Sequence, residues 1–232
     1  MAFAVIGSSF AQDSKAPKKI DLSGQAGDHF MFQIGSDRWL NMPDSISNHK
    51  KGFSRSASVY IMLNKPFKSN PKLSAAFGIG VGTSHIFFEK TSIDINGTTP
   101  VLHFNALDTL SRFKKYKVST AYAEIPVELR FTSHPDKPNK SFKAAIGVKV
   151  GTILNAHTKG KNFQNAAGTS TIGYTQKISS TSYFNNTRLA ATARVGYGPV
   201  CLFGTYNFAA VFKDNVAAKM NLLQIGLSIS GL

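Results

Sequence analysis

The sequence predicts an all-β fold, an eight-stranded antiparallel up-and-down transmembrane β-barrel. The clearest stretch is residues 219–232, where Leu223, Ile225, Leu227 and Ile229 share one face and small or polar residues share the other. Strict alternation of this kind is typical of a β-strand, because successive side chains point to opposite sides of a sheet. Seven further segments alternate in the same way, and their mid-strand charges avoid the apolar face. An apolar face toward lipid and a polar face toward the lumen is what a membrane barrel requires.

The expected strands are separated by glycine- and proline-rich turns. In the third strand Gly78, Gly80 and Gly82 lie on one face, where they leave room for bulky neighbours. Its GIGVG run lacks the spacing of a nucleotide-binding loop, and no helical pattern follows it. Pro126 falls in the middle of the fourth strand, where we expect a β-bulge. The eight predicted strands are residues 28–42, 53–64, 72–89, 115–133, 141–155, 187–197, 200–212 and 219–232.

The connections between these strands alternate in length. Short turns follow the second, fourth and sixth strands, whereas residues 90–114 and 156–184 form long polar segments. Outer-membrane barrels show this alternation, with brief periplasmic turns and longer extracellular loops. Binding sites tend to lie in long loops on a rigid scaffold, so these two segments are candidate binding surfaces.

The charged strand face is expected to line the lumen. A charge placed toward lipid would cost about 2–4 kcal/mol at the bilayer midplane. Because eight strands enclose a space just filled by side chains, we expect a salt-bridged plug and not a pore. A soluble ligand-binding barrel, with its apolar faces inside, is the rival fold. The expected lumen charge network is Glu124, Glu128, Arg130, Lys143, Lys149, Arg188 and Arg194.

Aromatic residues near the strand ends are expected to form interfacial girdles around the barrel. General packing within the sheet is the alternative explanation. The girdle residues would be Phe67, Phe131, Phe142 and Tyr197 at the turn end, and Phe87, Phe208 and Phe212 at the loop end.

The N-terminal residues divide into two expected segments. Residues 1–11 resemble a truncated signal peptide that is cut after Ala11 and lacks a basic start, although a disordered N-terminus would look similar. Residues 12–27 are polar and are expected to form a flexible periplasmic segment before the barrel at 28–232.

The net charge of +15 calls for an acidic environment or partner. Nucleic acid and an anionic membrane surface such as lipopolysaccharide are both candidates. The basic residues are scattered through turns and loops, so we expect no nucleic-acid binding. No apolar run is long enough for a transmembrane helix. The lone Cys201 excludes an intrachain disulfide and a cysteine-based zinc site.

No strong catalytic or metal-binding pattern is present. The histidines form no H-x-x-x-H pair, so neither a metal nor another cofactor is expected. Ser84 and His85 beside Glu89 are the one compact candidate for a rim-sited hydrolase. Glu124 and Glu128 are spaced like a catalytic carboxylate pair, but the basic residues around them favour structural ion pairing. We therefore expect that the protein is not an enzyme.

Four segments resemble a known family. DHFMFQIGSDRWLN, KLSAAFGIGVGTSHIFF, AYAEIPVELRF and QIGLSISGL are similar to the outer-membrane β-barrel proteins of Bacteroidetes-type bacteria, the PorT-like group, over residues 28–232. The resemblance implies a location in the cell outer membrane and a porin-like label, and some PorT-like members belong to a secretion and gliding apparatus.

The expected function is a structural or binding role in the cell envelope. The alternatives are a small-solute porin, a PorT-like component of a secretion complex, and the rim-sited hydrolase. The expected partners are outer-membrane lipid and lipopolysaccharide, together with an envelope protein complex.

Overall fold

The computed structural model describes residues 30–169 and 171–230. The expected signal peptide and the segment at 12–27 lie outside the described residues. No helix in the described ranges is long and apolar enough to cross a membrane. In chain order the elements are β1 (Phe30–Leu40), α1 (Asp44–Ser47), β2 (Arg55–Pro66), β3 (Leu73–Phe88), β4 (Thr91–Ile93), β5 (Phe104–Ala106), β6 (Arg112–Thr132), a 3-10 helix η2 (Pro138–Lys140), β7 (Phe142–Gln164), β8 (Thr171–Ser179), β9 (Thr187–Tyr197), β10 (Val200–Asn207) and β11 (Asn221–Ser230).

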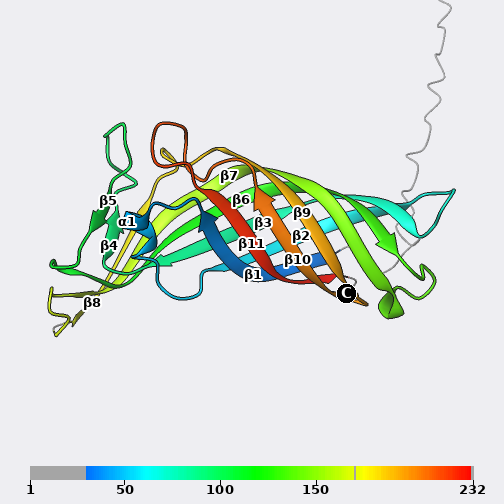
Figure 1. The fold of residues 1–232 in the computed structure, drawn as a ribbon, viewed down its shortest axis with the longest axis horizontal. Coiled ribbons are helices and arrows are strands. Elements are labelled where there is room, and N and C mark those ends of the chain that lie inside the picture. The colour runs from blue at the N-terminus through cyan, green and yellow to red at the C-terminus, as the bar shows by residue number, and fades with distance from the viewer. Residues whose placement is uncertain (1–29, 170, 231–232) are drawn as a thin grey trace, which may run out of the picture.

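Eight of the strands close into a ring, as predicted. The order is β1-β2-β3-β6-β7-β9-β10-β11, and every neighbouring pair is antiparallel. The first and last strands close the ring in a continuous register that runs from Met31 opposite Ser230 to Leu40 opposite Asn221. Closure removes the open sheet edges that would otherwise expose unpaired backbone groups. Figure 1 shows the tilted strands between the short turns at one end and the long loops at the other.

The outer wall of the ring is apolar. Ile79 and Ile146 expose 63% and 64% of their surface, whereas the inward-facing Gln33 and Glu128 are each only 2% exposed. A soluble ligand-binding barrel has the opposite arrangement, so that rival is wrong. We call the outward side chains of the mid-strand region the apolar belt. On the eight strands it includes Ile34, Val59, Ile79, Ile125, Ile146, Leu189, Leu202 and Ile225.

The β-bulge that we expected at Pro126 is not there, and the irregularity of β6 and β7 lies near Ala121 instead. The ladder between β3 and β6 keeps one register on both sides of Pro126 and only omits the pairs at that point. Because proline has no N–H to donate, the ladder loses contacts there without gaining a residue. The register shift falls between Ala121 and Tyr122, opposite an extra residue of β7, Leu154.

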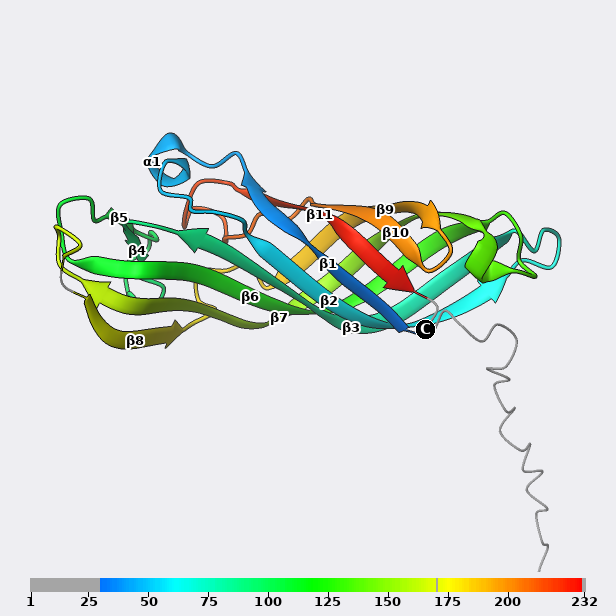
Figure 2. The same ribbon diagram turned by 90° about the horizontal axis from the view of Figure 1, so that it is seen from below.

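The two long segments contain more strand than expected. Strand β6 has 21 residues and β7 has 23, whereas β10 has only eight. About ten residues suffice to cross a membrane, so β6 and β7 continue well beyond that length. β8 pairs with the far part of β7, and β4 pairs with β5. Figure 2 shows β6, β7 and β8 projecting together at the loop end.

One expected girdle residue is buried instead. Strand β10 ends at Asn207, and the chain beyond it turns inward, so Phe212 is only 1% exposed. Its ring packs against Trp39 at 5.4 Å and Phe184 at 5.1 Å between centroids. Phe87 is half-buried beneath the Arg55 guanidinium. The girdle residues that the structure leaves exposed are Phe67, Phe131, Phe142, Tyr197 and Phe208.

Phe212 belongs to a hydrophobic core that fills the loop end of the barrel, and we call this core the apolar cap. Inward-facing strand ends and loop residues build it together, which was not predicted. Its buried members are Trp39, Ile46, Ile86, Phe88, Ile93, Ile95, Leu102, Tyr116, Val118, Ala156, Tyr183, Phe184, Phe212, Met220 and Leu222.

Candidate functional site in the barrel lumen

The structure brings six of the seven lumen charges together in the barrel interior. All six are less than 8% exposed and point inward from β6, β7 and β9. Lys143 is only half-buried and lies where the lumen opens at the turn end, beside Arg130 and Arg194. The six buried residues are Glu124, Glu128, Arg130, Lys149, Arg188 and Arg194.

Glu128 is the centre of the group nearer the turn end. Arg194 donates from Nη2 to Oε2 at 2.6 Å and from Nε to Oε1 at 3.2 Å. Arg130, two residues further along β6, donates from Nε to Oε2 at 2.9 Å. The Glu128 side chain leans over Gly147, where an added Cβ would lie 2.9 Å from the glutamate Cα. Two guanidinium groups therefore hold one fully buried carboxylate in place.

Glu124 is the centre of the second group. Arg188 donates from Nη1 to Oε1 at 2.7 Å, and the Tyr60 hydroxyl donates to Oε2. Lys149 Nζ donates to the Tyr60 hydroxyl at 3.1 Å and to Gln33 Oε1 at 2.9 Å. Four strands, β1, β2, β6 and β7, and Arg188 of β9 thus meet through hydrogen bonds across the lumen.

The glycines of β3 make room for these side chains, as the sequence predicted. A Cβ at Gly80 would lie 2.5 Å from the Tyr60 ring, and one at Gly82 would lie 3.0 Å from Glu124 Oε2. The distance at Gly80 is shorter than real Cβ contacts, and the one at Gly82 is tight, so a larger residue at either position would push the network aside.

Sequence reasoning missed a third buried carboxylate, Asp37, which is 1% exposed. Gln224 Nε2 donates to its Oδ1 at 3.0 Å, and the Ser84 hydroxyl donates to its Oδ2. Asp37 shares its strand face with Gln33, so the period-two pattern already placed it inside. With Asp37 included, three carboxylates face four buried cations.

The candidate hydrolase residues are not assembled. Ser84 points into the lumen, whereas the next residue, His85, points outward and contacts Ser119 Oγ through Nδ1 at 2.8 Å. Adjacent residues of a strand must face opposite sides, so this separation is built into β3. Glu89 pairs with Lys51 at 2.6 Å, and that hydrogen bond lowers the pKa of Glu89. Among the described residues, no three His, Cys, Asp or Glu side chains gather into a metal site.

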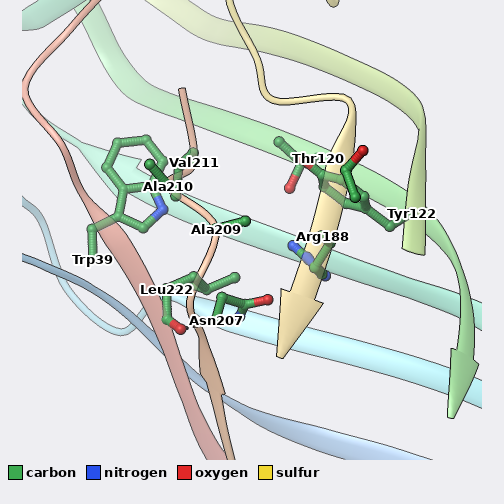
Figure 3. A pocket seen from close by; sticks show the side chains of 10 residues that line it. Trp39, Thr120, Tyr122, Arg188, Asn207, Ala209, Ala210, Val211 and Leu222 are labelled. Carbon is green, nitrogen blue, oxygen red and sulfur yellow. Dashed lines mark hydrogen bonds between the residues drawn. The ribbon is translucent and has the colours of Figure 1, made fainter. Parts of the chain in front are cut away.

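Two small cavities open into the lumen. One lies between Trp39 and Arg188 below the apolar cap, and its wall is visible in Figure 3. The other lies at the turn end beside Arg130 and Lys143. Each measures about 20 Å³, room for about one water. The fully buried Lys149 projects into the lumen from β7, where it donates hydrogen bonds to Gln33 and Tyr60.

An antiparallel ring of eight strands with an apolar exterior and a charged interior defines a transmembrane β-barrel. The family model described as "Outer membrane protein beta-barrel domain" matches residues 10–213, and the chain belongs to this family. The protein is therefore an outer-membrane β-barrel protein. A comparison with curated proteins found no match.

Proposed function

We propose that this protein is a non-conducting outer-membrane barrel with a structural or binding role in the cell envelope. Its membrane-spanning part is a closed barrel, and its loops form a surface outside the membrane. The observation that carries the proposal is the lumen itself, which buried ion pairs fill at two levels and the apolar cap covers.

A small-solute porin would require these ion pairs to separate. Opening a path past Glu128 would leave a carboxylate without its arginine partners in a confined space. Breaking a buried ion pair in this way costs about 3–5 kcal/mol. The apolar cap would have to open as well, because its aromatic side chains close the loop end. A barrel with a blocked lumen therefore accounts for the buried ion pairs better than a channel does.

A place in an envelope protein complex is a second candidate. The loop end carries exposed apolar side chains, among them Val101 at 47%, Leu110 at 56% and Ile172 at 66%. Exposed apolar residues outside the membrane favour a protein partner. The resemblance to PorT-like barrels supports the same idea. We assign no catalytic role, because β3 separates Ser84 from His85.

Conductance measurements in planar bilayers test the proposal. We expect the refolded full-length protein to insert without opening stable channels. The variant Lys149→Gln, which weakens the contacts across the lumen, should remain closed because Tyr60 and the arginines still fill the space. Lys143→Gln, at the lumen mouth, is the matched control. A stable open channel whose ion selectivity changes in Lys149→Gln but not in Lys143→Gln would refute the proposal in favour of a porin.

A further inference from the structure

A group of lysines lies on the outward face of β6, β7 and β8, where these strands leave the barrel. Lys117 is the direct partner of Lys159, and Lys159 is the direct partner of Lys177. One step further toward the loops, Lys115 is opposite Lys161. Direct partners in an antiparallel sheet project on the same face with their Cβ atoms about 5 Å apart. These five residues, the lysine patch, therefore share one surface of the three-stranded projection seen in Figure 2.

The lysine patch has no counter-charge of its own. Strands β7 and β8 contain no Asp or Glu, and both glutamates of β6 face the lumen. Within the described part of the chain, no carboxylate lies within ion-pair distance of the five ammonium groups. Like charges directly opposite each other destabilise a sheet. An anion from outside the chain would remove this repulsion.

The neighbouring titratable groups do not change this balance. The patch lies beyond the apolar belt, where Phe87 of β3 is the direct partner of Lys117. The nearest outward histidines on β3 and β7 are His85 and His157. Partial burial, and then Lys177 and Lys117, lower the pKa of His157 to about 4, so that its ring is neutral at pH 7. Partial burial, and then nearby lysines, lower the pKa of Lys117. Arg55, whose guanidinium lies over the Phe87 ring, adds positive charge, and Glu89, just beyond the end of β3, is paired with Lys51. The net charge of this surface is therefore positive.

The height of the patch relative to the belt points to lipid headgroups. On β6 the outward face is apolar from the turn end as far as Ala121, and Lys117 lies four residues nearer the loop end. Four residues of a strand span about 13 Å, or about 10 Å along the membrane normal at a tilt of about 40°. The headgroup region extends about 5–8 Å beyond the hydrocarbon on each side. At about 10 Å the Lys117 backbone lies at the outer edge of the headgroup layer, and its long side chain extends back toward the lipid phosphates. The long loops at this end mark it as the outer leaflet.

A groove within the patch suits an anion attached to an apolar body. It measures about 220 Å³ and is lined by Phe87, Tyr116 and lysines of β6 and β7. An ammonium group is a compact charge that binds phosphate, and the outward-facing ring of Phe87 offers apolar contact beside it. We propose that the lysine patch binds the phosphate groups of a phosphorylated glycolipid of the outer leaflet. This inference rests on the outer-membrane location and is independent of whether the lumen conducts.

The test compares three probes against the full-length protein folded in detergent micelles. The probes are diphosphorylated lipid A, dephosphorylated lipid A and inorganic phosphate. We expect tight binding of the diphosphorylated lipid only. A lysine near an anionic membrane surface contributes about fivefold to affinity, so Lys117→Gln, Lys159→Gln and Lys177→Gln together should weaken binding about 100-fold.

A matched control removes the same charge from the opposite end of the barrel. Lys65, Lys68 and Lys72 are exposed around the turn between β2 and β3. Their triple glutamine variant should bind diphosphorylated lipid A within about twofold of the wild type. Both triple variants should keep the heat-dependent gel mobility shift of a folded barrel, because their side chains are on the surface.

Three outcomes would overturn the proposal. Equal losses in the two triple variants would show that overall charge, and not this patch, attracts the lipid. Equal binding of dephosphorylated lipid A would remove the role of phosphate. Inorganic phosphate that binds the patch as tightly as the lipid would identify a free anion as the ligand. An open channel in bilayers would contradict the proposed function and leave this proposal intact.

Discussion

Removing Arg194 should destabilise the barrel more than any surface change, because its guanidinium makes two of the three side-chain hydrogen bonds to Glu128. The carboxylate is fully buried, with a side-chain exposure of 0%. In Arg194→Met the buried glutamate keeps only its hydrogen bond to Arg130. Breaking one side of a buried ion pair costs about 3–5 kcal/mol, a large part of the 5–15 kcal/mol that stabilises a typical domain.

The informative comparison is with a variant that removes the whole group. Glu128→Leu combined with Arg130→Met and Arg194→Met removes the carboxylate together with both guanidinium groups that bind it. Replacing a buried ionic group by apolar residues of similar volume is often neutral or stabilising. We therefore expect the triple variant to regain most of the stability that the single variant loses.

Urea unfolding in lipid vesicles measures both effects. The single tryptophan, Trp39, lies in the apolar cap and reports loss of the packed state by fluorescence, while heat-dependent gel mobility reports the closed barrel. As a control, Lys68→Gln on the exposed turn between β2 and β3 should change the free energy of unfolding by less than about 0.5 kcal/mol, as surface substitutions usually do. A loss of less than about 1 kcal/mol in Arg194→Met, or a triple variant as unstable as the single one, would contradict this prediction.

Three further predictions concern packing and lipid contact. Phe212→Ala should lower the free energy of unfolding by about 3–5 kcal/mol, because it opens a cavity in the apolar cap. Phe208→Ala should cost far less, because Phe208 is 53% exposed, and equal costs would place Phe212 outside the core. Gly80→Ala should lower the free energy of unfolding by about 1–3 kcal/mol, because its Cβ would overlap the Tyr60 ring. Gly204→Ala, with open space around it, should leave the stability unchanged, and equal urea midpoints for the two variants would contradict this prediction. Ile146→Arg, on the lipid face, should cost about 2–4 kcal/mol in vesicles, and a neutral result would argue against burial in lipid.

Period-two alternation made the strands and their faces predictable from sequence. The pattern identifies the face of each residue without any knowledge of pairing, which is why the ring strands and their inward charges could be assigned. It does not identify the end of the sheet. For this reason the alternation predicts that the seventh strand continues to residue 212. In the structure β10 ends at Asn207, and the chain then turns into the apolar cap.

The partners within the lumen could not be predicted, because they depend on register around the whole ring. Arg194 reaches Glu128 across β7, which separates their strands. The extra residue Leu154 then shifts every later residue of β7 to the opposite face. The bulge was expected at Pro126 because proline cannot donate to the ladder. In the structure the β3–β6 ladder lacks the pairs at Pro126 but keeps its register, and the sequence contains no comparable signal at Leu154.

The apolar cap and the lysine patch have one physical cause. Within the belt, lipid surrounds the barrel, so β6 turns Ile125 outward and Glu124 inward. Beyond the belt the surroundings are polar, and the same strand turns Lys117 outward and Val118 inward.

Strands β3 and β1 reverse in the same way, because the last residue of β3, Phe88, and the penultimate residue of β1, Trp39, point inward. The alternation continues through both regions, but the apolar face changes sides between Ala121 and Lys117 of β6. That reversal marks the membrane boundary from the sequence pattern itself. It also explains why one barrel contains a charged interior within the membrane and a hydrophobic core outside it.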